Sequence, residues 1–173
     1  MRGQVILSHG LDASPAATKV SALAMLAESL GWRAFKPDYR EDDALGHADC
    51  VLPRLARLLA VIDAQPQQPL VLVGSSMGAF VSGLASLQRP VAGLFLLATP
   101  SEIPGHPQAF DLRSDVPACL IHGWNDDVCP PAGVIAFAGK RRLPLLMLDD
   151  DHRLGASMAT IEWQFRQLLG AWE

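Results

Sequence analysis

The sequence contains no long run of apolar residues, although half of its 173 residues are hydrophobic. A helix that crosses a membrane needs ~20 consecutive apolar residues, so we expect no membrane span and no membrane partner. The chain begins with Met-Arg-Gly-Gln and then enters an apolar segment at once, which leaves no room for a signal peptide. The sequence therefore predicts a cytoplasmic protein.

The net charge is small, and both cysteines and cofactor-binding motifs are scarce. Fourteen Lys and Arg residues against eighteen Asp and Glu residues give a net charge of −4, which provides no positive field for nucleic acid. The three cysteines, Cys50, Cys119 and Cys129, lack C-x-x-C spacing, so we expect neither a disulfide framework nor a zinc site. No His, Cys and Asp residues cluster at metal-ligand spacing, and no G-x-G-x-x-G follows the first apolar segment. We expect no metal and no other cofactor.

Short apolar segments alternate with amphipathic ones along the whole chain. The apolar segments are predicted strands, and they span Gln4–Ser8, Trp32–Pro37, Pro69–Gly74, Val91–Ala98, Pro117–His122 and Leu143–Leu148. Helical spacing predicts helices that begin at an N-cap on Ser14, near Asp49, at Met77, at Pro131 and at Ser157, whereas Asp38–Asp43 is a predicted loop. This alternation indicates an α/β fold, with a mostly parallel sheet, helices on both faces and a single domain over residues 1–173.

A candidate nucleophile follows the third predicted strand. Gly74-Ser75-Ser76-Met77-Gly78 fits G-x-S-x-G between a strand and a helix, which is the context of a nucleophile elbow. The two glycines keep β-carbons out of the sharp turn, and the turn lifts the Ser76 hydroxyl above the sheet. It also places the Met77 N–H at a helix N-terminus, where it can stabilise an oxyanion.

A candidate acid and a candidate base follow the fifth and sixth predicted strands. Active sites of parallel sheets lie beyond the carboxyl ends of the strands. The segment after the fifth strand contains Asp126 and Asp127, and His152 follows the sixth strand after three aspartates. A serine needs a base, and the base needs an acidic group to orient it, so the order Ser, Asp, His predicts a triad. We interpret Asp149, Asp150 and Asp151 as solvated loop residues.

These segments together resemble the α/β-hydrolase superfamily, among its small lidless bacterial members. The resemblance rests on the GSSMG, HGWNDDVCP and DDDHRL segments and covers nearly the whole chain. It implies a minimal six-stranded sheet of order 2-1-3-4-5-6, without the two leading antiparallel strands of the superfamily. In the family pattern H-G-x-x-D-x-x-V-P the acid falls on Asp126, and Asp127 is its rival. The His-Gly that ends the first strand implies the Leu11 N–H as a second oxyanion donor.

The resemblance also bears on substrate size. Superfamily members often carry a cap domain in the interval that is Thr99–Val116 here, and this interval is too short for one. We therefore expect an open cleft for small esters, lined by Leu11, Met77, Ile103, Phe110 and Trp124.

The predicted function is that of a serine hydrolase that cleaves small or short-chain carboxylic esters. A thioesterase, amidase, small peptidase or acyltransferase would use the same triad. The alternative from another class is a non-catalytic binding or scaffold protein, and fold alone does not fix the substrate. The sequence leaves the oligomeric state open.

Overall fold

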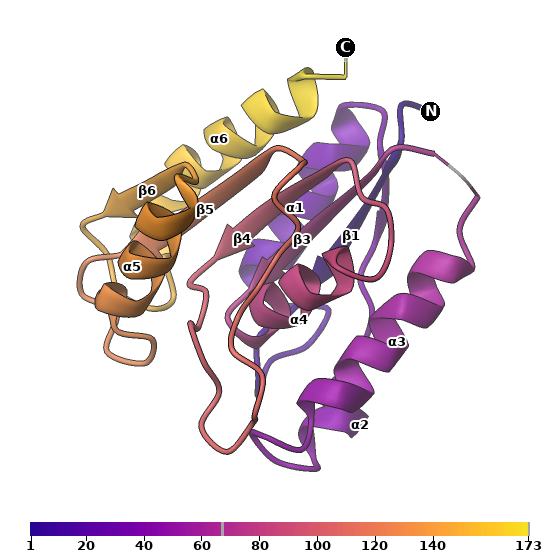
Figure 1. Ribbon diagram of the computed structural model, residues 1–173. Helices are drawn as coiled ribbons and strands as arrows, with labels where there is room; N and C mark the ends of the chain where they lie inside the picture. Colours follow the sequence, from indigo (N-terminus) through magenta and orange to yellow (C-terminus); the bar gives the residue numbers. More distant parts are fainter. Residues whose placement is uncertain (67, 173) are drawn as a thin grey trace.

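A six-stranded sheet organises the chain. The computed structural model describes residues 1–66 and 68–172. Its strands are β1 (Gln4–Ser8), β2 (Arg33–Phe35), β3 (Leu70–Ser75), β4 (Gly93–Leu97), β5 (Ala118–Gly123) and β6 (Leu145–Leu148). They lie in the order β2-β1-β3-β4-β5-β6, and every neighbouring pair is parallel (Figure 1). The strand order that the family resemblance implied is confirmed, and the sheet of the described residues is wholly parallel.

Both faces of the sheet are covered, which explains why the strands are apolar without alternation. Along β1, the Ile6 side chain joins one hydrophobic cluster, whereas Val5 and Leu7 join the cluster on the opposite face. Side chains in a strand point alternately to the two faces, so a strand with two buried faces needs apolar residues at successive positions. The prediction of a buried parallel sheet is confirmed on this basis.

Helices form the two covering layers. The helices are α1 (Thr18–Ser29), α2 (Arg40–Asp43), α3 (Val51–Asp63), α4 (Met77–Ser86), α5 (Pro131–Arg141) and α6 (Met158–Gly170). Leu55 of α3, Phe80 of α4 and Val134 of α5 belong to one cluster. Leu23 of α1 and Phe165 of α6 belong to the other, and Figure 1 shows these two groups of helices on opposite sides of the sheet. None of the helices within residues 1–66 and 68–172 is both long and apolar enough to span a bilayer.

The predicted start of the first helix is wrong. Ser14 does not cap α1, which begins at Thr18 after an uncapped Ala17. The Ala17 N–H donates to the Ser14 carbonyl at 3.0 Å, so residues 14–17 form a turn with Pro15 at its second position. Proline is favoured there because its fixed φ suits the turn. The same Ser-Pro pair that indicates a helix start therefore makes a turn just before it.

The predicted loop at Asp38–Asp43 contains the short helix α2. Asp42 and Asp43 of this helix form ion pairs with Arg57 and Arg54 of α3. These partners lie 15 and 11 residues further along the chain, so helical periodicity within the segment gives no sign of them. Packing against α3 stabilises a single helical turn that would not form in isolation.

The interval that could hold a cap contains no helix and no strand. Residues 99–116 run as irregular chain across the molecule between β4 and β5 (Figure 1). Ile103, Phe110 and Leu112 anchor this interval, because each is buried in the cluster around α3 and α4. The interval is thus part of the packed body, with no cap built into it.

Candidate active site

Ser76 stands on a strained turn between β3 and α4. Its φ of 55° and ψ of −118° lie in a region that residues with a side chain rarely adopt. Two glycines make the turn possible because they allow neighbouring backbone segments to approach closely. A β-carbon on Gly74 would collide with the Gly78 carbonyl, and one on Gly78 would collide with the Ser8 carbonyl at the end of β1. The G-x-S-x-G spacing therefore reflects three backbone segments that meet with no room for side chains.

A chain of two hydrogen bonds joins Ser76, His152 and Asp126. His152 Nε2 lies 3.0 Å from Ser76 Oγ, and His152 Nδ1 lies 2.8 Å from Asp126 Oδ2. With the proton on Nδ1 donated to the carboxylate, Nε2 accepts the Ser76 hydroxyl proton. The three residues follow β3, β6 and β5, so the carboxyl ends of three strands supply one continuous proton path.

The Asp126 carboxylate is held in place by several donors. Its Oδ1 accepts the N–H groups of Val128 at 3.0 Å and Cys129 at 2.7 Å, and its side chain is fully buried. His122 Nε2 lies 3.3 Å from Oδ2 and donates to the Cys129 carbonyl at 2.7 Å. Asp127 is exposed instead. Asp126 is thus the aspartate that the structure brings to His152.

The loops that follow β5 and β6 are joined to each other. The N–H groups of Trp124 and Asn125 donate to the carbonyls of Leu148 and Asp150, at 2.8 and 3.0 Å. A β-carbon on Gly123 would collide with the Asp150 carbonyl, so this glycine permits the approach. These contacts fix the loop of the acid against the loop of the base.

Asp149 and Asp151 are exposed loop residues, in line with their interpretation as solvated, and Asp150 is half-buried, but all three side chains also accept local hydrogen bonds. Asp149 accepts from Asn125 Nδ2 at 3.0 Å, Asp151 accepts the Arg153 N–H at 2.9 Å, and Asp150 accepts the Ser157 hydroxyl at 2.7 Å. The Ser157 hydrogen bond lowers the pKa of Asp150. Asp residues often bond backbone a few positions away in turns, and this tendency is the signal that could have identified them.

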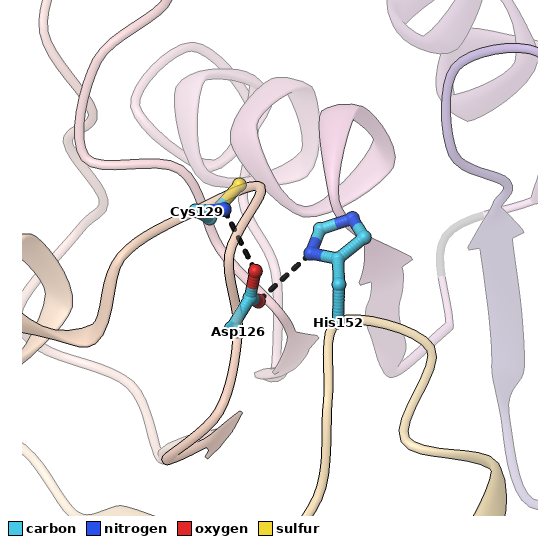
Figure 2. A group of neighbouring side chains, drawn as sticks. All are labelled: Asp126, Cys129 and His152. Atoms are coloured by element: carbon cyan, nitrogen blue, oxygen red, sulfur yellow. Dashed lines mark hydrogen bonds and ion pairs between the residues drawn. The ribbon is translucent and has the colours of Figure 1, made fainter.

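Cys129 lies beside the triad but is poorly suited to act as a nucleophile. Figure 2 shows Cys129 and His152 on either side of the Asp126 side chain. Burial, together with the Asp126 charge, raises the pKa of the Cys129 thiol to about 12, so it stays protonated at neutral pH. Ligand atoms of Asp126, Cys129 and His152 lie within 4.8 Å of one another and could hold a metal ion. The Asp126 oxygens, however, already accept N–H groups, which fits a carboxylate that orients an imidazole.

Two backbone N–H groups lie close to Ser76, one on the residue that follows it and one on Leu11, which lines the same cavity as Ser76. Met77 begins α4, and Leu11 follows the His9-Gly10 pair at the end of β1. Within residues 1–66 and 68–172, neither amide has a hydrogen-bond acceptor. A β-carbon on Gly10 would lie 3.5 Å from the Ser76 β-carbon, so the Leu11 loop sits directly against the elbow. Free N–H groups in this position can stabilise an oxyanion.

A cavity of about 680 Å³ opens beside Ser76 and His152. Its apolar lining includes Leu11, Val128 and Met158, and its charged lining comprises Asp12, Lys19 and Arg153.

Four of the five expected lining residues do not line this cavity, and Leu11 is the one that does. Met77 is 2% exposed and belongs to the core cluster around α3 and α4. Ile103 and Phe110 are 5% and 4% exposed and belong to the core, whereas Trp124 is 56% exposed and lies outside the lining. Loop residues that anchor a segment and loop residues that line a cleft have the same composition, so sequence alone did not separate them.

The comparisons with known proteins agree on the fold. A solved structure from Xanthomonas campestris pv. campestris, assigned to the alpha/beta superfamily of hydrolases, is 42% identical, with a TM-score of 0.92. The match covers 98% of this chain and 99% of that one. The chain therefore belongs to the α/β-hydrolase superfamily. It matches no protein-family model and no curated protein.

Two more distant structures share the fold. A serine hydrolase without a lid from Xanthomonas campestris has a TM-score of 0.79 at 20% identity, over 99% of this chain and 82% of that one. The Est1E protein of Butyrivibrio proteoclasticus, solved with ferulic acid, has a TM-score of 0.78 at 17% identity, over 98% and 88%. At these identities the likeness concerns the fold alone.

Proposed function

We propose that this protein is a serine hydrolase of small or short-chain carboxylic esters, working as a single domain without a cap. The observation that carries the proposal is the hydrogen-bonded chain Ser76–His152–Asp126 beside a cavity with two free backbone N–H groups. A solvated or purely structural serine would need neither a buried acid behind its histidine nor a strained backbone.

The proposed reaction starts with attack of Ser76 Oγ on the ester carbonyl carbon, while His152 Nε2 takes the hydroxyl proton. Asp126 keeps the imidazole in the reactive tautomer and stabilises its positive charge. The N–H groups of Leu11 and Met77 donate to the oxyanion of the tetrahedral intermediate. The alcohol leaves with the proton from His152, and water activated by His152 then hydrolyses the acyl-enzyme.

The cavity supports a substrate of modest size. Its apolar residues, Leu11, Val128 and Met158, offer contacts to a short acyl chain, and the irregular interval at residues 99–116 adds no cover above them. We place the acyl group against these three side chains rather than against Ile103, Phe110 or Trp124.

Labelling with a fluorophosphonate and turnover of p-nitrophenyl esters test the proposal together. The wild-type protein should be labelled at Ser76 and should hydrolyse the acetyl and butyryl esters. Ser76→Ala should lose labelling and lower kcat by ~10⁴–10⁶. Ser75→Ala is the matched control, since Ser75 ends β3 and is 8% exposed, and it should keep most of the activity. A wild-type protein that is neither labelled nor active on esters, thioesters or amides would support the scaffold alternative.

A further inference from the structure

A fully buried arginine contacts residues 9–11 at the end of β1, the oxyanion loop, which carries the Leu11 N–H. Arg54 lies on α3 with its side chain 0% exposed, and it pairs with Asp43 of α2, whose side chain is 6% exposed. Arg54 Nε and Nη2 donate to the two carboxylate oxygens at 2.5 and 2.8 Å. Tyr39 packs its ring 4.6 Å from the guanidinium carbon. This bidentate pair is net neutral, so its role depends on position more than on its long-range field.

The remaining donors of Arg54 go to the backbone of the oxyanion loop. Nη1 donates to the His9 carbonyl at 2.8 Å, and Nη2 donates to the Gly10 carbonyl at 3.1 Å. The peptide between Gly10 and Leu11 is trans, so its C=O and N–H point in opposite directions. A Gly10 carbonyl that points at Arg54 therefore turns the Leu11 N–H away from α3 and toward the elbow.

His9 fixes the same loop from a second direction. Its Nδ1 donates to the Gly10 carbonyl at 2.7 Å, and its Nε2 accepts the Tyr39 N–H at 3.0 Å. The Gly10 carbonyl thus receives hydrogen bonds from both Arg54 and His9. Two donors on one carbonyl leave the following peptide unit little freedom to rotate.

We propose that Arg54, held by Asp43, is a positioning residue that aims the Leu11 N–H at the oxyanion. This inference rests on the proposed function. Arg54 does not touch the reacting atoms. It acts through the peptide unit, and a loss of Arg54 should weaken transition-state stabilisation more than substrate binding.

A neighbouring ion pair shows what a merely structural role looks like. Arg57 of α3 pairs with Asp42 of α2, with Nε 2.7 Å from Oδ2, and its side chain is 38% exposed. Within residues 1–66 and 68–172, the hydrogen-bond partners of Arg57 are the acidic side chains of Asp42 and Glu41, and neither belongs to the oxyanion loop. Arg57 and Asp42 therefore provide a matched control on the same two helices.

The test compares an oxoester with its thionoester, in which sulfur replaces the carbonyl oxygen. Sulfur is the weaker hydrogen-bond acceptor, so the ratio of the two kcat/KM values reports on the oxyanion donors. The double variant Arg54→Leu/Asp43→Asn removes both buried charges together, which avoids an unpaired charge in the core. We expect kcat for the oxoester to fall ~10–100-fold with KM within ~threefold, and the oxo-to-thiono ratio to fall ~tenfold. Arg57→Leu/Asp42→Asn should keep the wild-type ratio.

Circular dichroism establishes that each variant is folded before its kinetics are compared. If the double variant fails to fold, Arg54→Lys is measured instead, because lysine keeps the charge for Asp43 but lacks the planar fork whose three nitrogens reach the carboxylate and both carbonyls. The same fall in the ratio is expected for it. A folded Arg54 variant with a wild-type ratio, in a protein whose activity Ser76→Ala abolishes, overturns the positioning role alone. Absence of Ser76-dependent turnover in the wild type overturns the proposed function and this inference with it.

Discussion

At the scale of single residues, hydrogen bonds hold the acid of the candidate triad in a fixed orientation. Asp126 accepts two backbone N–H groups and the His152 imidazole, so both carboxylate oxygens are engaged before any substrate arrives. Preorganised groups of this kind cost no reorganisation during the reaction. A substitution of such a group should therefore have a much larger effect on activity than the same substitution of an exposed neighbour.

The first prediction separates Asp126 from Asp127. Asp126→Asn should lower kcat by ~10⁴, because an amide that donates to His152 Nδ1 leaves the proton on the wrong imidazole nitrogen. Asp127→Asn changes an exposed neighbour by the same chemistry and should leave kcat within about twofold. Steady-state hydrolysis of a p-nitrophenyl ester measures both. Equal losses in the two variants would contradict the assignment of the acid.

The second prediction concerns His9 and pH. Burial lowers the pKa of His9 in the folded state, so the unfolded chain binds a proton more readily. The free energy of unfolding should hence be unaffected by His9 above its unfolded pKa, ~6.5, and should fall as the pH drops below it. Protonation of one group changes the free energy of unfolding by up to ~1.4 kcal/mol per pH unit.

Urea unfolding between pH 7.5 and 5 measures this slope. His9→Gln should have a shallower dependence than the wild type, whereas His47→Gln, at an exposed histidine, should keep the wild-type dependence. If the His9 and His47 variants have the same slope, His9 is not the group that titrates.

At the scale of elements, the elbow depends on how closely β1, β3 and α4 approach. All ten residues of α4 are buried, and Gly78 lies against the Ser8 carbonyl at the end of β1. A side chain between these segments would have to push the helix away from the sheet. The position of Ser76 is therefore coupled to helix packing.

The third prediction tests this coupling with two glycines. Gly78→Ala should lower the free energy of unfolding by ~1–3 kcal/mol, because the methyl group overpacks a rigid backbone contact. It should also reduce activity through the displaced elbow. Gly139→Ala is the control, since a β-carbon there on α5 meets nothing within 4 Å. That change should raise stability by up to ~1 kcal/mol without altering kcat. A stable, fully active Gly78→Ala would contradict the coupling.

Elements with a strong hydrophobic pattern could be predicted from the sequence. Elements that depend on contacts between residues far apart in the sequence could not. The strands β1, β3 and β4 are apolar runs with two buried faces, so their pattern is visible in the chain itself. The helix α2 depends on Arg54 and Arg57, which follow it by more than ten residues.

The residues of the candidate site also fall into those that the sequence predicts and those that it does not. Ser76, Asp126 and His152 follow strands and have recognisable neighbours, whereas the reach of Arg54 to Gly10 joins residues 44 positions apart. One signal for Arg54 was available. It occupies a position between Val51, Leu55 and Leu58 on the apolar stripe of α3, where a charged side chain needs a buried partner.

At the scale of the whole molecule, the irregular interval between β4 and β5 matters most. Phe110 of this interval packs against Phe80 and Phe137 in the core, with ring centroids 6.1 and 4.8 Å apart. The interval is thus bound to the body of the protein and is not arranged as a hinged cover. No residue of this interval lines the cavity beside Ser76.

The fourth prediction is a preference for short acyl chains. Each buried methylene contributes ~0.8 kcal/mol, so kcat/KM should rise with chain length only while added carbons still contact the cavity. A series of p-nitrophenyl esters from acetate to palmitate should give a maximum at short chains. No increase in rate should accompany the formation of an emulsion. A steady rise to palmitate, or a jump at the solubility limit, would contradict an open site.

The position of β6 at an edge of the sheet predicts which part of the protein unfolds first in denaturant. This four-residue strand lies at one of the two edges of the sheet and, among the described residues, pairs with β5 on one side alone, yet the segment that follows it carries His152. Edge strands with few neighbours open at lower free-energy cost than central ones. Mild denaturant should therefore detach the histidine first, so that turnover vanishes while circular dichroism still reports a folded sheet, and deuterium should enter the β6 amides before those of β3.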